Sequence, residues 1–160
     1  MRTSSPADEL MNIALIGYGK MGRLIEQLAA ERGHAITVTV SESHADLSAE
    51  QLAETLRAAD VAIDFTVADA VRRNVEACVV AGTPIVVGTT GWNDQKDEVE
   101  QTVTKGNGAM VYGANFSIGV NLFYRVAELP PSFLRNSRNT KPLLKSSTIR
   151  ERKTHRAGPR

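Results

Sequence analysis

The chain has 160 residues, of which 42% are hydrophobic, and its formal net charge is +1 at pH 7. This length suits one hydrophobic core and argues against two full domains. No apolar run reaches the length of a membrane span, and residues 1–10 lack the apolar stretch of a signal peptide, so we expect a cytoplasmic protein that binds no membrane.

The first predicted unit is a short apolar strand that runs into a glycine-rich turn, NIALIGYGKMG at residues 12–22. Gly17 permits a tight strand-to-helix turn, Gly19 lets the backbone approach a pyrophosphate, and Gly22 allows the helix to pack closely on the strand. The phosphates would then lie at a helix N-terminus, which favours anions. By itself the glycine pattern is a weak signal, because such turns also serve merely to reverse a chain.

The context of the turn favours a dinucleotide site. A helix is predicted over residues 20–32, and a β-branched strand follows over 36–40. Glu42 comes next, twenty residues after Gly22, where a carboxylate can accept hydrogen bonds from an adenosine ribose. Without the upstream turn, Glu42 would be read as a solvated loop residue. The predicted helix carries four apolar residues on one face: Met21, Leu24, Ile25 and Leu28.

The following elements alternate regularly between helix and strand. Helices are predicted over 48–59 with a Ser48–Gln51 capping box, over 68–81 ending at Gly82, and over 93–105; strands are predicted over 60–66, 84–87 and 109–112. This alternation predicts an α/β fold with a Rossmann-like, doubly wound parallel sheet covered on both faces. Ligands of such sheets bind at the carboxyl ends of the strands.

Three more segments reach that edge beside the glycine turn: residues 64–66, 88–91 and 113–117. The 88–91 loop, GTTG, is either a plain turn or a surface that a flat nicotinamide ring can approach closely. Ala114, Asn115 and Phe116 are either ordinary strand-to-helix residues or an amide and an aromatic ring that orient a carboxamide and cover a ring.

The single cysteine and the histidines give no sign of a metal. Cys78 lies in an apolar helical pattern and is expected to be a small buried residue rather than a nucleophile or a ligand. His34 and His44 have no spacing to cysteine or carboxylate residues that a metal site requires, and we read them as surface or loop residues.

The motifs GYGKMG, DFT, GTTGW and GANFSIGVN, in this order and spacing, resemble those of the 4-hydroxy-tetrahydrodipicolinate reductase (dihydrodipicolinate reductase) family over about residues 11–124. The resemblance implies NAD(P)H-dependent reduction of 4-hydroxy-tetrahydrodipicolinate to tetrahydrodipicolinate in lysine and diaminopimelate biosynthesis. It also implies a small dicarboxylate substrate and, in the intact family, a homo-oligomer. GTTGW with GANFSIGVN argues against a related Rossmann enzyme that acts on an aldehyde or an amino acid.

The resemblance further implies which residues hold the cofactor. No arginine follows Glu42 directly, since Ser43 and His44 do, so a 2′-phosphate would face a carboxylate without a partner. We therefore expect NADH or NADPH as cofactor, with NADH preferred. The implied cofactor-binding residues are Gly17, Tyr18, Gly19, Lys20, Met21, Gly22, Glu42, Gly88, Thr89, Thr90, Gly113, Ala114, Asn115 and Phe116.

The chain departs from the family pattern near Arg125. Family members continue into a substrate domain with the motif HHxxKxDxPSGTA, in which, the resemblance implies, a histidine donates the proton and the lysine and the SGT turn hold substrate carboxylates. In frame the motif is missing. If the third base of each codon is read with the first two of the next, the codons from Ser147 to Arg160 permit His-His, then Lys, then Asp-Ala-Pro-Ser-Gly-Thr-Ala. We therefore expect a frameshift between about Arg125 and Ser147.

The expected organisation is a disordered extension over residues 1–10, a dinucleotide-binding domain over 11–128 and a disordered basic tail over 129–160, with the substrate domain missing. The chain would bind cofactor but hold no catalytic residue, and His155 would have no role. The alternative is a non-catalytic nucleotide-binding module whose tail recruits an acidic partner, because residues 130–160 contain nine basic and one acidic residue. Nucleic acid is not expected, since the tail has one aromatic residue and no predicted helix.

Overall fold

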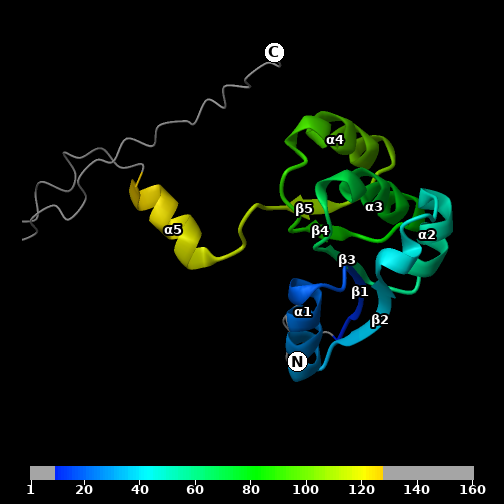
Figure 1. The fold of residues 1–160 in the computed structure, drawn as a ribbon, viewed down its shortest axis with the longest axis horizontal. Helices are drawn as coiled ribbons and strands as arrows, with labels where there is room; N and C mark the ends of the chain where they lie inside the picture. Colours follow the sequence, from blue (N-terminus) through cyan, green and yellow to red (C-terminus); the bar gives the residue numbers. More distant parts are fainter. Residues whose placement is uncertain (1–9, 128–160) are drawn as a thin grey trace, which may run out of the picture. The chain divides into compact units, whose positions relative to one another are not determined.

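The computed structural model describes residues 10–127 and consists of two units, Met1–Asn121 and Leu122–Arg160. Apart from Leu10, the expected extension over residues 1–10 and the expected tail over 129–160 lie outside the described residues. The strands are β1 (Asn12–Ile16), β2 (Ala35–Val40), β3 (Val61–Asp64), β4 (Ile85–Val87) and β5 (Met110–Tyr112) (Figure 1). The helices are α1 (Lys20–Glu31), α2 (Ala49–Leu56), α3 (Ala68–Ala81), α4 (Lys96–Lys105) and α5 (Ile118–Ala127), with short 3-10 helices η2 (Glu42–His44) and η3 (Asn93–Gln95).

Five parallel strands form one sheet in the order β2-β1-β3-β4-β5. The chain runs from β1 to β2 in one direction and from β3 to β5 in the other, so the strand order reverses between β1 and β3 (Figure 1). There the last residues of the two strands, Ile16 and Asp64, are paired. The arrangement confirms the predicted Rossmann-like, doubly wound α/β fold, whose ligands bind where the strand order reverses.

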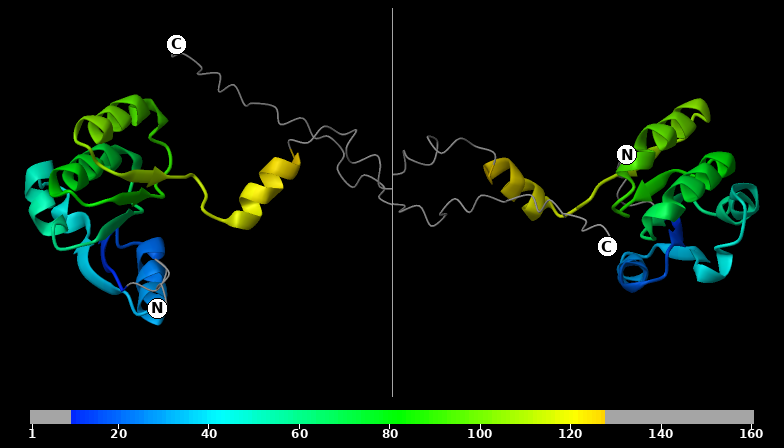
Figure 2. Two further views of the ribbon diagram at one scale, coloured as in Figure 1. Left: turned by 180° about the vertical axis from the view of Figure 1, so that it is seen from behind. Right: turned by 45° about the horizontal axis from the view of Figure 1, so that its top comes forward.

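The larger hydrophobic core lies between the sheet and helices α2, α3 and α4, while α1 packs on the opposite face (Figure 2). Helix α3 has the predicted bounds and ends at Gly82, whose φ of +75° is left-handed. The side chains that fill this core are almost fully buried because each projects from the inner face of its helix or strand; they include Ile16, Leu52, Leu56, Val71, Val75, Cys78, Ile85, Val87 and Val99.

Helix α1 buries less of its apolar face than its spacing suggests. Ile25 packs on the cluster of Ile13, Leu15 and Ala29. The other three apolar residues of that face remain 36–47% exposed: Met21, Leu24 and Leu28. The apolar stripe therefore extends beyond what β1 and β2 cover.

The ends of the helices follow local capping chemistry. At the start of α2 the Ser48 amide donates to Oε1 of Gln51 (2.9 Å), and the Gln51 amide donates to Oγ of Ser48 (3.3 Å), so the predicted capping box is confirmed. Helix α2 ends at Leu56 rather than at residue 59. The helix expected over 93–105 is divided into η3 and α4, and α5 had no counterpart among the elements predicted from residue patterns.

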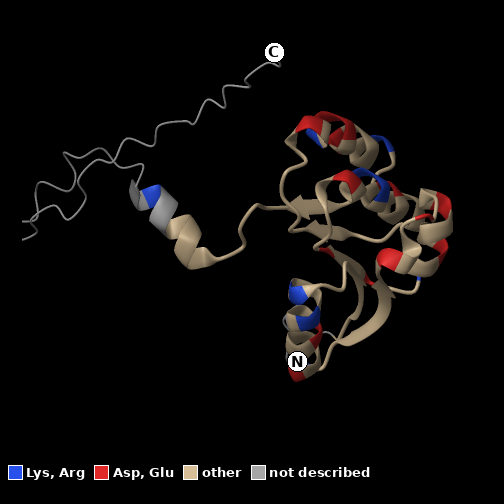
Figure 3. Cartoon of the chain, viewed as in Figure 1, with Lys and Arg blue, Asp and Glu red and all other residues tan. Residues whose placement is uncertain are grey.

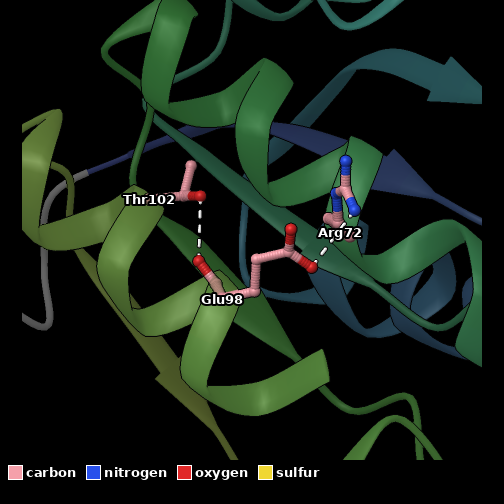
Figure 4. A network of polar contacts seen from close by, with 3 residues as sticks. All are labelled: Arg72, Glu98 and Thr102. Carbon is pink, nitrogen blue, oxygen red and sulfur yellow. Dashed lines mark hydrogen bonds and ion pairs between the residues drawn. The ribbon is translucent and has the colours of Figure 1, made fainter. Parts of the chain in front are cut away.

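Charged residues lie mainly on the helices, and the strands carry few (Figure 3). Between α3 and α4, Arg72 Nη1 lies 3.1 Å from Glu98 Oε2, and Thr102 Oγ1 donates to the Glu98 carbonyl at 3.0 Å (Figure 4). Because both partners of this ion pair are more than half exposed, it contributes less than about 1 kcal/mol to stability. Among residues 10–127, none of the helices has the length and apolar character needed to span a bilayer.

Candidate functional site

The glycine turn joins three strand ends at the point where the strand order reverses. The Gly17 amide donates to the carbonyl of Val40 (2.8 Å), and the Phe65 amide donates to the carbonyl of Ile16 (2.9 Å). Gly17 has a φ of +94°, and a Cβ there would lie 2.4 Å from the carbonyl oxygen of Phe65. Only glycine fits this crossing, because a side chain would be strained and would collide with backbone.

The other two glycines of the turn differ in their surroundings. A Cβ on Gly22 would lie 2.3 Å from the Gly17 carbonyl oxygen, so Gly22 permits the close contact between helix and turn. A Cβ on Gly19 would meet nothing within 4 Å. The backbone at Gly19 is thus open to a ligand, as the close approach of a pyrophosphate requires.

The start of α1 also suits an anion. Gly19 is its N-cap and offers no side-chain cap, and the first turn has no acidic residue. Within the described part of the chain, no acceptor is found for the amides of Lys20 and Met21, whose side chains are exposed. Unpaired amides and the helix dipole attract negative charge. These residues therefore fit the phosphates of a dinucleotide.

Tyr18 is held against α1 rather than pointed across the turn. Its hydroxyl donates to the Glu26 carboxylate, and the Arg23 guanidinium lies 5.6 Å from the centre of its ring. The hydrogen bond to Glu26 is the main cause that raises the pKa of Tyr18 above its ordinary value. These two contacts fix the Tyr18 side chain on α1.

Glu42 lies at the same edge as the glycine turn. It is exposed, and it comes two residues after Val40, whose carbonyl accepts the Gly17 amide. The segment that carries Glu42 is fixed by hydrogen bonds: the Ser41 amide donates to Nδ1 of His44 (3.3 Å), and Nη1 of Arg73 donates to the carbonyls of His44 (3.2 Å), Ala45 and Leu47. His44 therefore has a structural contact in this loop.

The two threonines of the 88–91 loop differ in burial and in their hydrogen bonds. Thr89 is 6% exposed, its hydroxyl donates to Oδ1 of Asp64 (2.8 Å), and its carbonyl accepts from Nε1 of Trp92 (2.8 Å). Thr90 is exposed. A Cβ on Gly88 would lie 2.2 Å from the Phe65 ring, so glycine there leaves room for that ring. The loop is anchored inside by Thr89 and presents Thr90 to solvent.

The fourth segment begins beside the end of β4, where the Gly113 amide donates to the Val87 carbonyl (3.1 Å). The ring of Phe116 folds back toward Gly113, yet it stays 47% exposed. Oδ1 of Asn115 accepts from the Ser117 amide (2.8 Å) and closes a local turn. Ala114 is exposed. The amide oxygen of Asn115 thus has a structural partner, while the Phe116 ring can cover a ligand.

Cys78 is fully buried, as its position in an apolar pattern predicted. Burial raises the pKa of its thiol to about 12, with a smaller contribution from Asp64. Such a thiol stays protonated and is a poor nucleophile or metal ligand. Across residues 10–127 no three His, Cys, Asp or Glu side chains are grouped so that they could hold a metal ion.

Two residues near the site were missed by sequence reasoning. Asn74 is fully buried and donates to Oδ2 of Asp64 (2.9 Å), and Trp92 holds the Thr89 carbonyl. A signal for Asn74 was present, because it occupies a core position between Val71 and Val75 on the inner face of α3. A polar residue at such a position needs a buried partner.

The comparison with known proteins covers nearly all of this edge. The family model "Dihydrodipicolinate reductase, N-terminus" matches residues 11–116. Three similar relatives are proteins named 4-hydroxy-tetrahydrodipicolinate reductase. The one from Christiangramia forsetii is 40% identical over 119 residues, which are 72% of this chain and 46% of the relative. Those from Natronomonas pharaonis and Acinetobacter baumannii are 36% identical over 125 residues (74% of this chain, 50% of the relative) and 32% identical over 136 residues (73% of this chain, 49% of the relative).

The chain spans about half the length of the curated relatives that it matches. The match to the family model begins just before β1 and ends at residue 116, so it contains all five strands and, except for Ser117, the four segments at their carboxyl edge. On this evidence the chain belongs to the dihydrodipicolinate reductase family, through that family's N-terminal domain.

Proposed function

We propose that the chain binds a nicotinamide dinucleotide at the carboxyl edge of its sheet and forms the cofactor-binding part of a reductase of 4-hydroxy-tetrahydrodipicolinate, the compound in the relatives' names. The observation that carries this proposal is the open backbone at Gly19 beside the unpaired amides of α1. The substrate is a small dicarboxylate, the pathway is lysine and diaminopimelate biosynthesis, and the location is the cytoplasm.

Each segment of the edge has a role in this proposal. The turn from Gly17 to Gly22 holds the pyrophosphate on its amides, and Glu42 accepts hydrogen bonds from the adenosine ribose. The backbone of residues 88–90 and the exposed Thr90 hydroxyl receive the nicotinamide end, and residues 113–116 border it with the Phe116 ring. When bound, the nicotinamide ring supplies the hydride of the reduction.

Gly19→Ala tests the pyrophosphate site. The added methyl group would occupy the space through which the phosphates approach, so we expect the Kd for NADH to rise at least tenfold, about 1.4 kcal/mol. Gly19 has a φ of −83°, which alanine adopts, and as an N-cap change the substitution costs about 1 kcal/mol of stability. The measurement is isothermal titration of the 160-residue chain with NADH.

Gly82→Ala is the matched control. Gly82 also has open space around it, but it lies at the C-terminus of α3, before β4 begins, and its φ of +75° makes alanine about 1 kcal/mol less stable. We expect a similar loss of stability with an unchanged Kd. Equal affinity of the Gly19 variant and the unaltered chain would place the phosphates elsewhere.

Glu42 is proposed to make NADH the preferred cofactor. A ribose diol can donate to its carboxylate, whereas a 2′-phosphate would be repelled by it, so we expect NADPH to bind at least tenfold more weakly than NADH. Glu42→Ala should weaken NADH binding by about 10- to 100-fold, since hydrogen bonds to a charged group contribute about 1.5–3 kcal/mol. Asp46→Ala, which removes another exposed carboxylate of the same segment, should change neither Kd. Tighter binding of NADPH than of NADH would overturn the preference.

The position of the catalytic segment is part of the same proposal. We propose that the histidine pair, the lysine and the SGT turn are encoded in the neighbouring reading frame, as the codons of residues 147–160 permit. The 160-residue chain then binds cofactor without reducing the substrate. The alternative, in which a basic tail recruits an acidic partner, concerns residues outside the described ones.

A further inference from the structure

A buried polar cluster lies behind the 88–91 loop, at the end of β3. Asp64 is 0% exposed. Its Oδ1 accepts hydrogen bonds from the amide and the hydroxyl of Thr66 (2.9 and 2.7 Å) and from the hydroxyl of Thr89 (2.8 Å), and its Oδ2 accepts from Nδ2 of Asn74 (2.9 Å). The cluster is satisfied, because both carboxylate oxygens have donors.

The cluster adds side-chain hydrogen bonds between the end of β3, the loop after β4 and helix α3. Thr89 is 25 residues from Asp64 and belongs to the next strand end, and the Thr66 amide also donates to the Thr89 hydroxyl (2.8 Å). On the other side, Trp92 holds the Thr89 carbonyl. The hydroxyl and the carbonyl of Thr89 are thus both fixed, so the backbone of the loop is held from two directions.

Burying a carboxyl group in a core costs free energy, because the group loses its hydration and needs hydrogen-bond donors in exchange. An aliphatic side chain of similar size needs none. Residues 62 and 87, on the same face of the sheet, are the aliphatic Ala62 and Val87. The polar group at position 64 therefore has a use that packing does not explain. Preorganised backbone donors and acceptors strengthen binding because less ordering remains when the ligand arrives.

We propose that Asp64 is a positioning residue for the nicotinamide half of the site: through the Thr89 hydroxyl, and together with Trp92, it fixes the Gly88–Gly91 loop in the form that receives the nicotinamide ring. This inference rests on the proposed function. A purely structural role of the cluster would affect binding of the whole cofactor, whereas this inference predicts an effect on the nicotinamide half alone. Within the described residues, the glycine turn and Glu42, which serve the adenosine half, make no hydrogen bond to Thr89.

Thr89→Val and Thr89→Ser test the inference by titration of the full chain with NADH and with ADP-ribose, which lacks the nicotinamide. Valine keeps the shape of threonine and removes the hydroxyl, whereas Asp64 keeps three of its donors. We expect Thr89→Val to weaken NADH binding about tenfold and to change ADP-ribose binding less than twofold. Thr89→Ser, which keeps the hydroxyl, should stay within about threefold of the unaltered chain for both ligands.

Thr102→Val is the matched control, since it removes a threonine hydroxyl bonded within α4 and should change neither affinity. If Thr89→Val does not fold, Trp92→Phe carries the test, because it removes the donor to the Thr89 carbonyl and keeps an aromatic ring against Tyr112. Equal losses for both ligands, or no loss for either, would overturn the inference. If the unaltered chain binds neither NADH nor ADP-ribose, the proposed function itself is overturned.

Discussion

Replacing Gly17 by alanine is expected to lower the free energy of unfolding by about 3 kcal/mol or more. Two independent terms act together. The φ of +94° is strained for any residue with a Cβ, and the new Cβ would lie 2.4 Å from the carbonyl oxygen of Phe65, which is backbone and cannot rotate away. Overpacking of this kind adds about 1–3 kcal/mol. Since a domain has only about 5–15 kcal/mol of stability, much of it would be lost.

Thermal and urea unfolding of the purified chain measure this effect, and the midpoint temperature should fall by about 10 °C or more. Gly33→Ala separates the two terms. Gly33 has a similar φ of +80°, but its Cβ would meet only the flexible side chain of Leu10, at 3.1 Å, so a loss of about 1 kcal/mol is expected. If both variants lose the same stability, the crossing of the turn over the end of β3 is looser than described.

These two glycines illustrate why much of the fold could be predicted from the sequence. A positive φ combined with a close backbone contact, as at Gly17, can be met by glycine alone, so the GxGxxG spacing carries geometric information that ordinary residues do not. The capping box at Ser48 and the inner face of α3 are equally local, because each follows from residues three or four positions apart. The alternation of strand and helix predicted a parallel sheet, whereas the order of its strands comes from the structure.

Other features depend on tertiary contacts that a pattern does not contain. The apolar spacing of α1 identified a face but not its extent of burial, since that depends on which strands lie beneath it. The two threonines of the 88–91 loop look alike in sequence, and only the approach of Asp64 and Trp92 shows that one is structural and the other exposed. Whether the residues at this edge hold a cofactor stays a prediction.

Restoring the neighbouring reading frame downstream of the shift is expected to turn a chain without reductase activity into an active enzyme. The described fold carries the proposed cofactor site, but among residues 10–127 no histidine lies at the proposed nicotinamide end. His34 instead contacts the Met11 amide, and His44 is bonded within its own loop. General acid catalysis requires a proton donor within hydrogen-bond reach of the substrate, and a dianion requires cationic or amide partners. The family motif that the codons of the other frame permit contains both.

The experiment begins with the nucleotide sequence from the codon of Asn115 to well beyond that of Arg160. If the other frame is open and reads His-His and then Asp-Ala-Pro-Ser-Gly-Thr-Ala, a gene with one base added, or two removed, before Ser147 should yield a reductase with turnover on the order of 1 s⁻¹ or more, while the chain as written shows none. Loss of NADH absorbance in the presence of 4-hydroxy-tetrahydrodipicolinate measures the rate.

The Kd for NADH should be similar in both chains, because the glycine turn and Glu42 are common to them. Gly19→Ala in the restored chain should raise KM for NADH. Turnover by the 160-residue chain itself, or codons that do not spell the motif, would refute the frameshift and would make a cofactor-binding module with a basic extension the better reading.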